Sequence, residues 1–160
     1  MKSQYYVNNK WSDIDSLNEN NFFSDLDGYN GSEKTVFFRF INESGDTQKN
    51  NVLLRIVEKY NSIEYPLAKF DNLVKASVGN PKIDSKISYS VLRNADPLNT
   101  TLGVISVPDE NGVFKIGDLP ADNGSLIFAV TLKIDSRIII DFGESLKVSD
   151  IFFRFSASTN

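Results

Sequence analysis

Apolar and polar residues alternate with a period of two along much of the chain from residue 35 onward. In residues 35–41, Val36, Phe38 and Phe40 fall on one face of an extended strand. Residues 126–134 place five apolar side chains at alternate positions: Leu126, Phe128, Val130, Leu132 and Ile134. Successive side chains of a β-strand point to opposite faces, so this period predicts strands with one buried face.

Shorter stretches repeat the pattern. Residues 52–60 place Val52, Leu54 and Ile56 on one face, although so short an apolar run is also compatible with a helix. Alternation recurs in residues 86–93, 113–117 and 150–155, and "RIII" at 137–140 predicts one further strand.

Two Asn-Gly pairs, Asn111-Gly112 and Asn123-Gly124, separate three predicted strands between residues 102 and 135. Asn and Gly tolerate the positive φ that tight turns between antiparallel strands require. Short strands with such turns indicate a mainly β fold. We expect an antiparallel β-sandwich of about seven or eight strands, immunoglobulin-like or jelly-roll-like.

One segment has the period of a helix instead. Apolar residues recur at positions 67, 70, 73 and 74, Pro66 suits the first helical position, and Gly79 and Pro81 follow. Proline at the start and glycine after the end are typical of a helix. We therefore predict one short helix over residues 66–78.

The tetrapeptide FFRF occurs twice, at residues 37–40 and 152–155. Both copies have the same alternation, so we predict two strands of one sheet that face the same environment. Arg39 and Arg154 then lie beside phenylalanines on a half-exposed face, where an arginine stem can cover an aromatic ring. Two alternatives remain open: a duplicated ligand site, and addition of one strand to a neighbour's sheet edge.

Residues 1–34 differ in composition, being dense in Asn, Asp and Ser with aromatic residues between them. We expect an N-terminal arm over 1–34, with Ser12 starting a short helix, and a β-sandwich domain over 35–160. The candidate interaction residues of the arm are Tyr5, Tyr6, Trp11, Phe22 and Phe23. Such aromatics favour packing into a neighbouring subunit, and a glycan-stacking surface that includes Tyr29 is the alternative.

Neither cysteine nor histidine occurs in the 160 residues. This excludes thiolate nucleophiles, disulfides, Cys/His zinc sites and histidine-dependent triads. The remaining catalytic routes are paired carboxylates, a lysine, or a hard metal on carboxylates. No short motif assembles one of these, so we expect neither an enzyme nor a cofactor.

Charge and hydropathy limit the partners further. Seventeen Lys and Arg against 21 Asp and Glu give a net charge of −4, without a basic cluster, so no nucleic-acid partner is expected. No apolar run approaches the ~20 residues that span a membrane, and none follows Lys2 as in a signal peptide. We expect synthesis in a cytoplasm, with a non-classical export route left open.

The stretch SDLDGYNG offers Asp25, Asp27 and Asn30 as oxygen ligands around the bend at Gly28. Calcium binds loops of this kind, which makes the three residues a weak metal candidate. The remaining EF-hand ligands are missing, so side-chain-to-backbone turns in a polar loop are the favoured interpretation.

Residues 109–124, DENGVFKIGDLPADNG, resemble the signature of collagen-adhesin B-type repeats and the related carboxypeptidase-regulatory-like domains. The matching residues are Asp109, Gly112, Phe114, Ile116, Leu119 and Pro120. The resemblance covers 16 of 160 residues and implies a prealbumin-like β-sandwich of the kind that serves as a stalk or spacer. It implies no functional residues, and turn chemistry alone also explains most of the matches.

Together these features predict a non-catalytic structural or assembly protein that acts through protein–protein contacts, as a homo-oligomer or within a larger assembly. The Asn- and Lys-rich, Cys-free composition resembles that of phage virion proteins, which suggests a tail, baseplate or head-appendage component located in the virion. A carbohydrate-binding or adhesin module, with a glycan as partner, is the alternative. A small carbohydrate-active enzyme ranks third.

Overall fold

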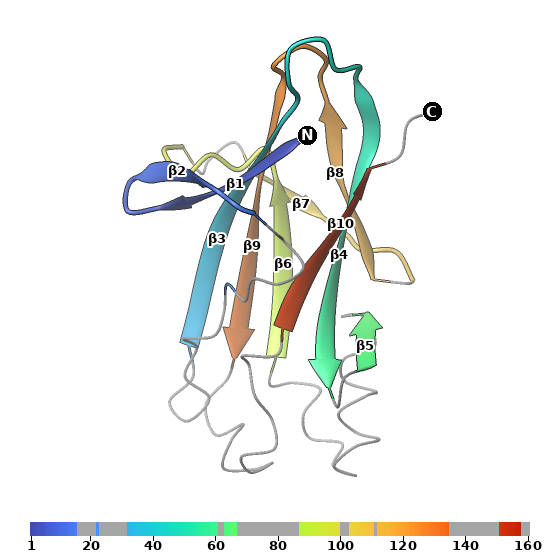
Figure 1. Ribbon diagram of the computed structural model, residues 1–160. Helices are drawn as coiled ribbons and strands as arrows, with labels where there is room; N and C mark the ends of the chain where they lie inside the picture. The colour runs from blue at the N-terminus through green and yellow to red at the C-terminus, as the bar shows by residue number, and fades with distance from the viewer. Residues whose placement is uncertain are drawn as a thin grey trace.

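The computed structural model describes residues 1–15, 22, 32–60, 63–66, 87–99, 103–110, 112–134 and 151–157. Within these residues the protein is mainly β and its strands form two antiparallel sheets, without a helix (Figure 1). The predicted fold class is thereby confirmed at this level. The helix expected over 66–78 lies outside the described residues, except that Pro66 is the last residue of a strand.

The larger sheet has six strands. Their spatial order is β2 (Lys10–Asp13), β1 (Lys2–Val7), β3 (Ser32–Ile41), β9 (Ser125–Ile134), β6 (Ile87–Arg93) and β7 (Val104–Ser106). The long central pair is β3 with β9, which runs in antiparallel register from Ser32–Ile134 to Ile41–Ser125.

The smaller sheet is built around one long strand. Its members are β10 (Ile151–Ala157), β4 (Lys49–Tyr60), β5 (Ile63–Pro66) and β8 (Val113–Leu119). Strand β10 pairs with one side of β4, while β8 and β5 pair with successive stretches of the other side. In Figure 1 these strands lie to the right of β3 and β9.

The buried residues follow the predicted alternation. They include Val36, Phe38 and Phe40 of β3; Leu126, Phe128, Val130 and Leu132 of β9; and Val52, Leu54 and Ile56 of β4. Phe38 and Phe128 stack with their ring centroids 5.3 Å apart. The Ser106 hydroxyl of β7 donates to the Lys115 carbonyl of β8 at 2.8 Å, which joins the two sheets.

Strand β8 departs from strict alternation because it contains an irregularity. Gly117 has φ +125°, and the pairing register between β4 and β8 shifts at this point. Phe114 and Ile116 are buried two residues apart, but the next buried residue is Leu119. The extra residue of a bulge moves the following side chains to the other face, which is why the strict period fails here.

The prediction that both FFRF copies belong to one sheet is wrong. The first lies in β3 of the six-stranded sheet, and the second lies in β10, paired with β4 of the other sheet. An alternating pattern indicates only that one face of a strand is buried, and a strand of either sheet can have such a face. The pattern therefore cannot distinguish between the two sheets.

The three strands expected between residues 102 and 135 are present, but they do not form hairpins. Strand β7 pairs with β6, β8 with β4, and β9 with β3 and β6, so each connection passes between the sheets. Gly112 has the predicted positive φ of 75°. In the second turn Asp122 and Asn123 carry the positive φ, and Gly124 is required because a Cβ would collide with Pro120.

The first 13 residues, expected as part of an arm, form a β-hairpin of the six-stranded sheet. Asn8 and Asn9 have φ of 54° and 61° and form a two-residue turn between the paired residues Val7 and Lys10. Positive φ at both central residues matches the right-handed twist of the flanking strands. Ser12, expected to start a helix, lies in β2 instead.

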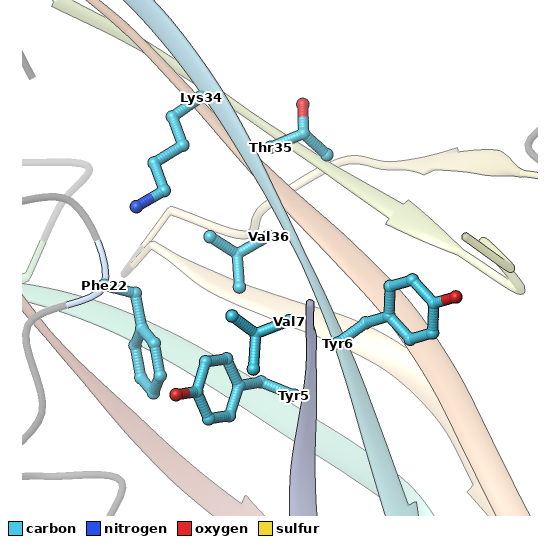
Figure 2. A pocket seen from close by; sticks show the side chains of 7 residues that line it. All are labelled: Tyr5, Tyr6, Val7, Phe22, Lys34, Thr35 and Val36. Carbon is cyan, nitrogen blue, oxygen red and sulfur yellow. The ribbon is translucent and has the colours of Figure 1, made fainter. Parts of the chain in front are cut away.

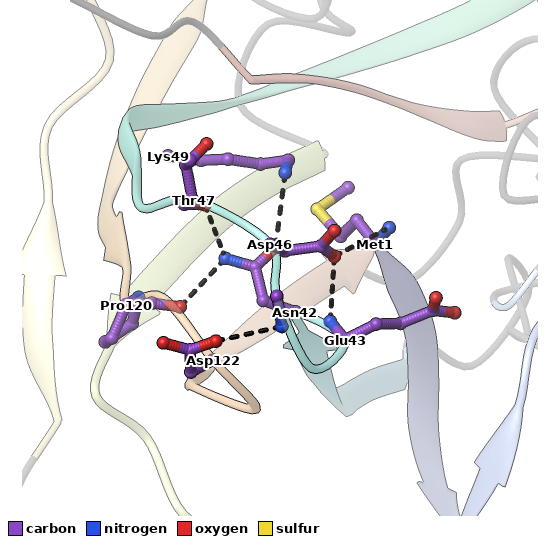
Figure 3. Close-up of polar contacts among 9 residues, drawn as sticks. Met1, Asn42, Glu43, Asp46, Thr47, Lys49, Pro120 and Asp122 are labelled. Atoms are coloured by element: carbon purple, nitrogen blue, oxygen red, sulfur yellow. Dashed lines mark hydrogen bonds and ion pairs between the residues drawn. The ribbon is translucent and has the colours of Figure 1, made fainter.

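A polar cluster at one end of the sheets joins the β3–β4 and β8–β9 connections (Figure 3). Asn42 is fully buried, and its Nδ2 donates to the carbonyls of Thr47 at 3.1 Å and Pro120 at 2.8 Å. Its Oδ1 accepts from Lys49 Nζ at 3.2 Å. Because its amide is satisfied on both sides, Asn42 can occupy a buried position that otherwise favours apolar residues.

Candidate functional site

The candidate aromatic residues do not form one patch. Tyr5 and Tyr6 are adjacent in β1 and therefore point to opposite faces of the sheet. Tyr5 is paired with Phe38 and lies on the core side, whereas Tyr6 is paired with Trp11 on the outer face. Figure 2 shows the Tyr6 ring pointing away from Tyr5. Phe23, like Tyr29, lies outside the described residues.

On the core side, the Phe22 ring lies between two others. Its centroid is 5.3 Å from that of Tyr5 and 5.1 Å from that of Phe38, both edge-to-face. This geometry is favourable for aromatic pairs. Phe22 therefore packs within its own chain, whereas the sequence favoured packing of the arm's aromatic residues into a neighbouring subunit.

A pocket of about 360 Å³ opens beside these rings (Figure 2). Its lining residues are Tyr5, Tyr6, Val7, Phe22, Lys34, Thr35 and Val36. The pocket lies where β1 separates from β3: their pairing ends at Tyr5–Phe38, and Val7 pairs with β2 alone.

On the outer face, the guanidinium of Arg39 lies over Trp11, with Cζ 4.5 Å from the ring centroid. Arg39 Nε donates to Gln4 Oε1 at 2.9 Å, and Nη2 donates to the same oxygen. Gln4 Nε2 donates to Asp13 Oδ1 at 2.8 Å, and Lys2 Nζ lies 3.2 Å from that oxygen. These contacts hold Arg39 in one position across three strands.

The surroundings of two charged groups in this cluster, Asp13 and Arg39, shift their pKa values. The hydrogen bond from Gln4 and then that from Lys2 lower the pKa of the Asp13 carboxyl below its usual value. Partial burial lowers the pKa of the Arg39 guanidinium, which nevertheless stays protonated at neutral pH. Arg39 is thus a half-buried cation whose hydrogen-bond acceptor, Gln4, is neutral.

An apolar row extends across the outer face of the sheet. Register places Phe37 beside Ala129, Ala129 beside Leu92, and Leu92 beside Ile105. Phe37 and Leu92 are half-buried, and Ile105 is 67% exposed. In the neighbouring row the hydroxyls of Thr35 and Thr131 are hydrogen bonded at 2.7 Å. Ala129, between Phe37 and Leu92, is buried, so the exposed apolar surface of the row lies mainly at Ile105.

Sequence reasoning found part of this surface. It identified Tyr6 and Trp11, whose ring centroids lie 5.3 Å apart, and it placed Arg39 over an aromatic ring. The ring is that of Trp11 rather than a phenylalanine beside Arg39 in its own strand. Gln4 and Asp13 were missed, although a hairpin turn at Asn8-Asn9 implies their pairing across β1 and β2.

The calcium candidates Asp25, Asp27 and Asn30 lie outside the described residues. In the part of the chain that the structure describes, no three Asp or Glu residues are grouped to hold a metal ion. The described residues form no helix that is long and apolar enough to cross a membrane.

The segment from 109 to 124 forms β8 and its flanking turns. Asp109 Oδ1 accepts from the Val113 amide at 3.0 Å, and its carbonyl accepts from the Gly112 amide at 3.0 Å. The aspartate, the glycine and the buried alternate residues of this segment thus have local structural roles.

Comparison with known proteins finds no match to a family model, a curated protein or a solved structure.

Proposed function

We propose that this protein is a non-catalytic subunit of a larger assembly and binds protein through the outer face of its six-stranded sheet. The apolar row from Phe37 to Ile105, which is partly exposed at Phe37 and Leu92 and most exposed at Ile105, carries the proposal. A sheet face that contacts only water is usually polar at alternate positions. Apolar residues on such a face favour contact with another protein surface.

The residues beside the row have the composition of an interface. Trp, Tyr and Arg are the residue types that most often dominate binding energy between proteins. Trp11, Tyr6 and Arg39 lie at one side of the row, and Trp11 contacts both of the others. Their mutual contacts restrict their rotamers, which lowers the entropy lost on binding.

The wider proposal concerns the fold and its setting. We propose that the two sheets form a β-sandwich, immunoglobulin-like or jelly-roll-like, and that the protein is a phage virion component of the tail, baseplate or head. The sequence without histidine or cysteine agrees with a non-catalytic role. The resemblance in composition to virion proteins supports the setting.

A carbohydrate-binding module is the second candidate, and Trp11 favours it. An indole beside the amide of Gln4 and the carboxylate of Asp13 combines a stacking surface with hydrogen-bonding groups. The guanidinium of Arg39 covers one face of that indole. A sugar must therefore stack on the other face or displace Arg39.

Light scattering behind size exclusion tests the first candidate, with the full chain over a range of concentrations. We expect a discrete oligomer that weakens when Ile105→Asp puts a charge into the apolar row. Leu98→Asp is the matched control, because Leu98 is 81% exposed and lies in a turn outside the row. The second candidate is supported instead if the chain stays monomeric and binds a glycan, and if Trp11→Ala abolishes that binding.

A further inference from the structure

The outer face of β3 carries opposite charges at its two ends. Glu33, Thr35, Phe37 and Arg39 occupy alternate positions and therefore share this face. Glu33 is exposed, and Arg39 lies six residues further along the strand, about 20 Å away at the usual rise. Between the two charges lie only a hydroxyl and an aromatic ring.

Neither charge has a counter-ion within the described residues. The ion pairs found there join the N-terminus with Asp46 and Lys2 with Asp13. Arg39 donates from Nε and Nη2 to the neutral side chain of Gln4. Within the described residues, Nη1 of the same guanidinium makes no hydrogen bond. Contact with the Trp11 ring holds the guanidinium in position to donate to a carboxylate.

We propose that a second copy of this chain packs face to face on the outer sheet, with Glu33 of each copy against Arg39 of the partner subunit. This inference rests on the proposed function and names its surface and its partner. The two-fold axis lies between the two facing sheets, perpendicular to β3 and level with residue 36. It reverses the strand direction, so position 33 of one copy lies over position 39 of the other, and position 35 lies over position 37. The charge pattern of β3 is thus complementary to itself.

The same arrangement also sets how the neighbouring rows of the face meet. The two-fold operation lays the Thr35–Thr131 row of one copy over the Phe37–Ala129 row of the other. Sheets pack face to face about 10 Å apart with strands nearly aligned, and Glu and Arg side chains can meet across that distance. A closed two-fold contact also uses the same patch on both copies, as homodimers commonly do.

Other charged groups on this face leave the pairing intact. Lys133 stands beside Glu33 on β9, but no ion pair between them is found in the described residues. Asp13 lies at the level of Arg39, two strands away, and is held by Gln4 and Lys2. Arg39 is therefore the cation that Glu33 of the partner subunit meets.

Charge reversal tests the inference with the full chain. Glu33→Arg and Arg39→Glu each place like charges opposite one another, and we expect each to weaken the dimer at least about tenfold, measured by sedimentation velocity. Mixing the two variants should restore dimerisation, because a mixed pair has complementary charges at both contacts. Glu43→Arg is the matched control for Glu33→Arg, since it makes the same change in net charge but lies in the β3–β4 connection.

The outcomes separate the inference from the proposed function. Circular dichroism of each variant verifies folding. If Arg39→Glu disturbs the hairpin, Glu33→Arg and Glu33→Gln still test the contact from the other side. If none of these substitutions weakens the oligomer, the inference is overturned, but the proposed assembly role is not. A wild-type chain that is monomeric at every concentration overturns the inference and self-assembly together.

Discussion

Phe37 and Phe38 are adjacent in β3 and have opposite environments. Phe38 is fully buried and contacts the rings of Phe22 and Phe128, whereas Phe37 is half-buried on the outer face. Neighbouring residues of the same type thus have different tasks, because side chains alternate along a strand. Phe38 is a core residue, and Phe37 belongs to the proposed interface.

This pair allows a matched test of core and surface. Phe38→Ala should lower the free energy of unfolding by about 3–5 kcal/mol, since it removes buried contacts and leaves a cavity. Phe37→Ala should cost at most about 1–2 kcal/mol, because its ring is already partly hydrated. Urea denaturation measures both. Equal losses would contradict the assignment of the two faces.

At the residue level, alternation along the sequence was sufficient to identify the core of β3, β4 and β9. It failed in β8, where the backbone irregularity at Gly117 brings Leu119 to the core. A side chain's burial follows from its own strand, but its partner follows from strand pairing. Arg39 accordingly lies over Trp11, which pattern reasoning along one strand could not identify.

The β1–β2 hairpin is the element that carries the outer-face cluster. Its two-residue turn pairs Gln4 with Asp13, and β3 then contributes Arg39. Asn8 and Asn9, taken as part of an arm, are the residues that set this register. Because each contact spans two strands, the hairpin and β3 must be in place before the cluster exists.

The hairpin should show a specific pH dependence. Its contacts hold the pKa of Asp13 below the usual value of about 3.9, so the Asp13 contribution to stability is present above that value. It is lost as the pH falls through the lowered pKa.

Asp13→Asn is the variant that isolates this contribution. Wild type should resist urea better than Asp13→Asn at pH 7, and the gap should close below about pH 4. Asp15→Asn is the control, since Asp15 is also exposed and has neither a hydrogen bond nor an ion pair within the described residues. A gap that widens in acid would contradict the argument.

For the whole molecule, both sheets contribute buried apolar residues, and Trp11, the single tryptophan, reports from the hairpin at the edge of the larger sheet. We expect Trp11 fluorescence and far-UV circular dichroism to give the same urea midpoint, because a small domain with one core usually unfolds cooperatively. A lower midpoint by fluorescence would show instead that the hairpin detaches first. Tyr6→Trp in a Trp11→Phe background provides a second probe on the same hairpin.

The sequence by itself determined the mainly β class, the buried face of most strands, and the exclusion of histidine and cysteine chemistry. These properties depend on local periodicity and composition, which the chain carries at each position. Only the tertiary structure decided which sheet each strand joins. It placed the two FFRF copies in different sheets, and it placed β8 in the smaller sheet while β7 and β9 belong to the larger one. It also brought Trp11, Gln4 and Arg39 together, because contacts between residues distant in sequence depend on strand pairing that no local pattern specifies.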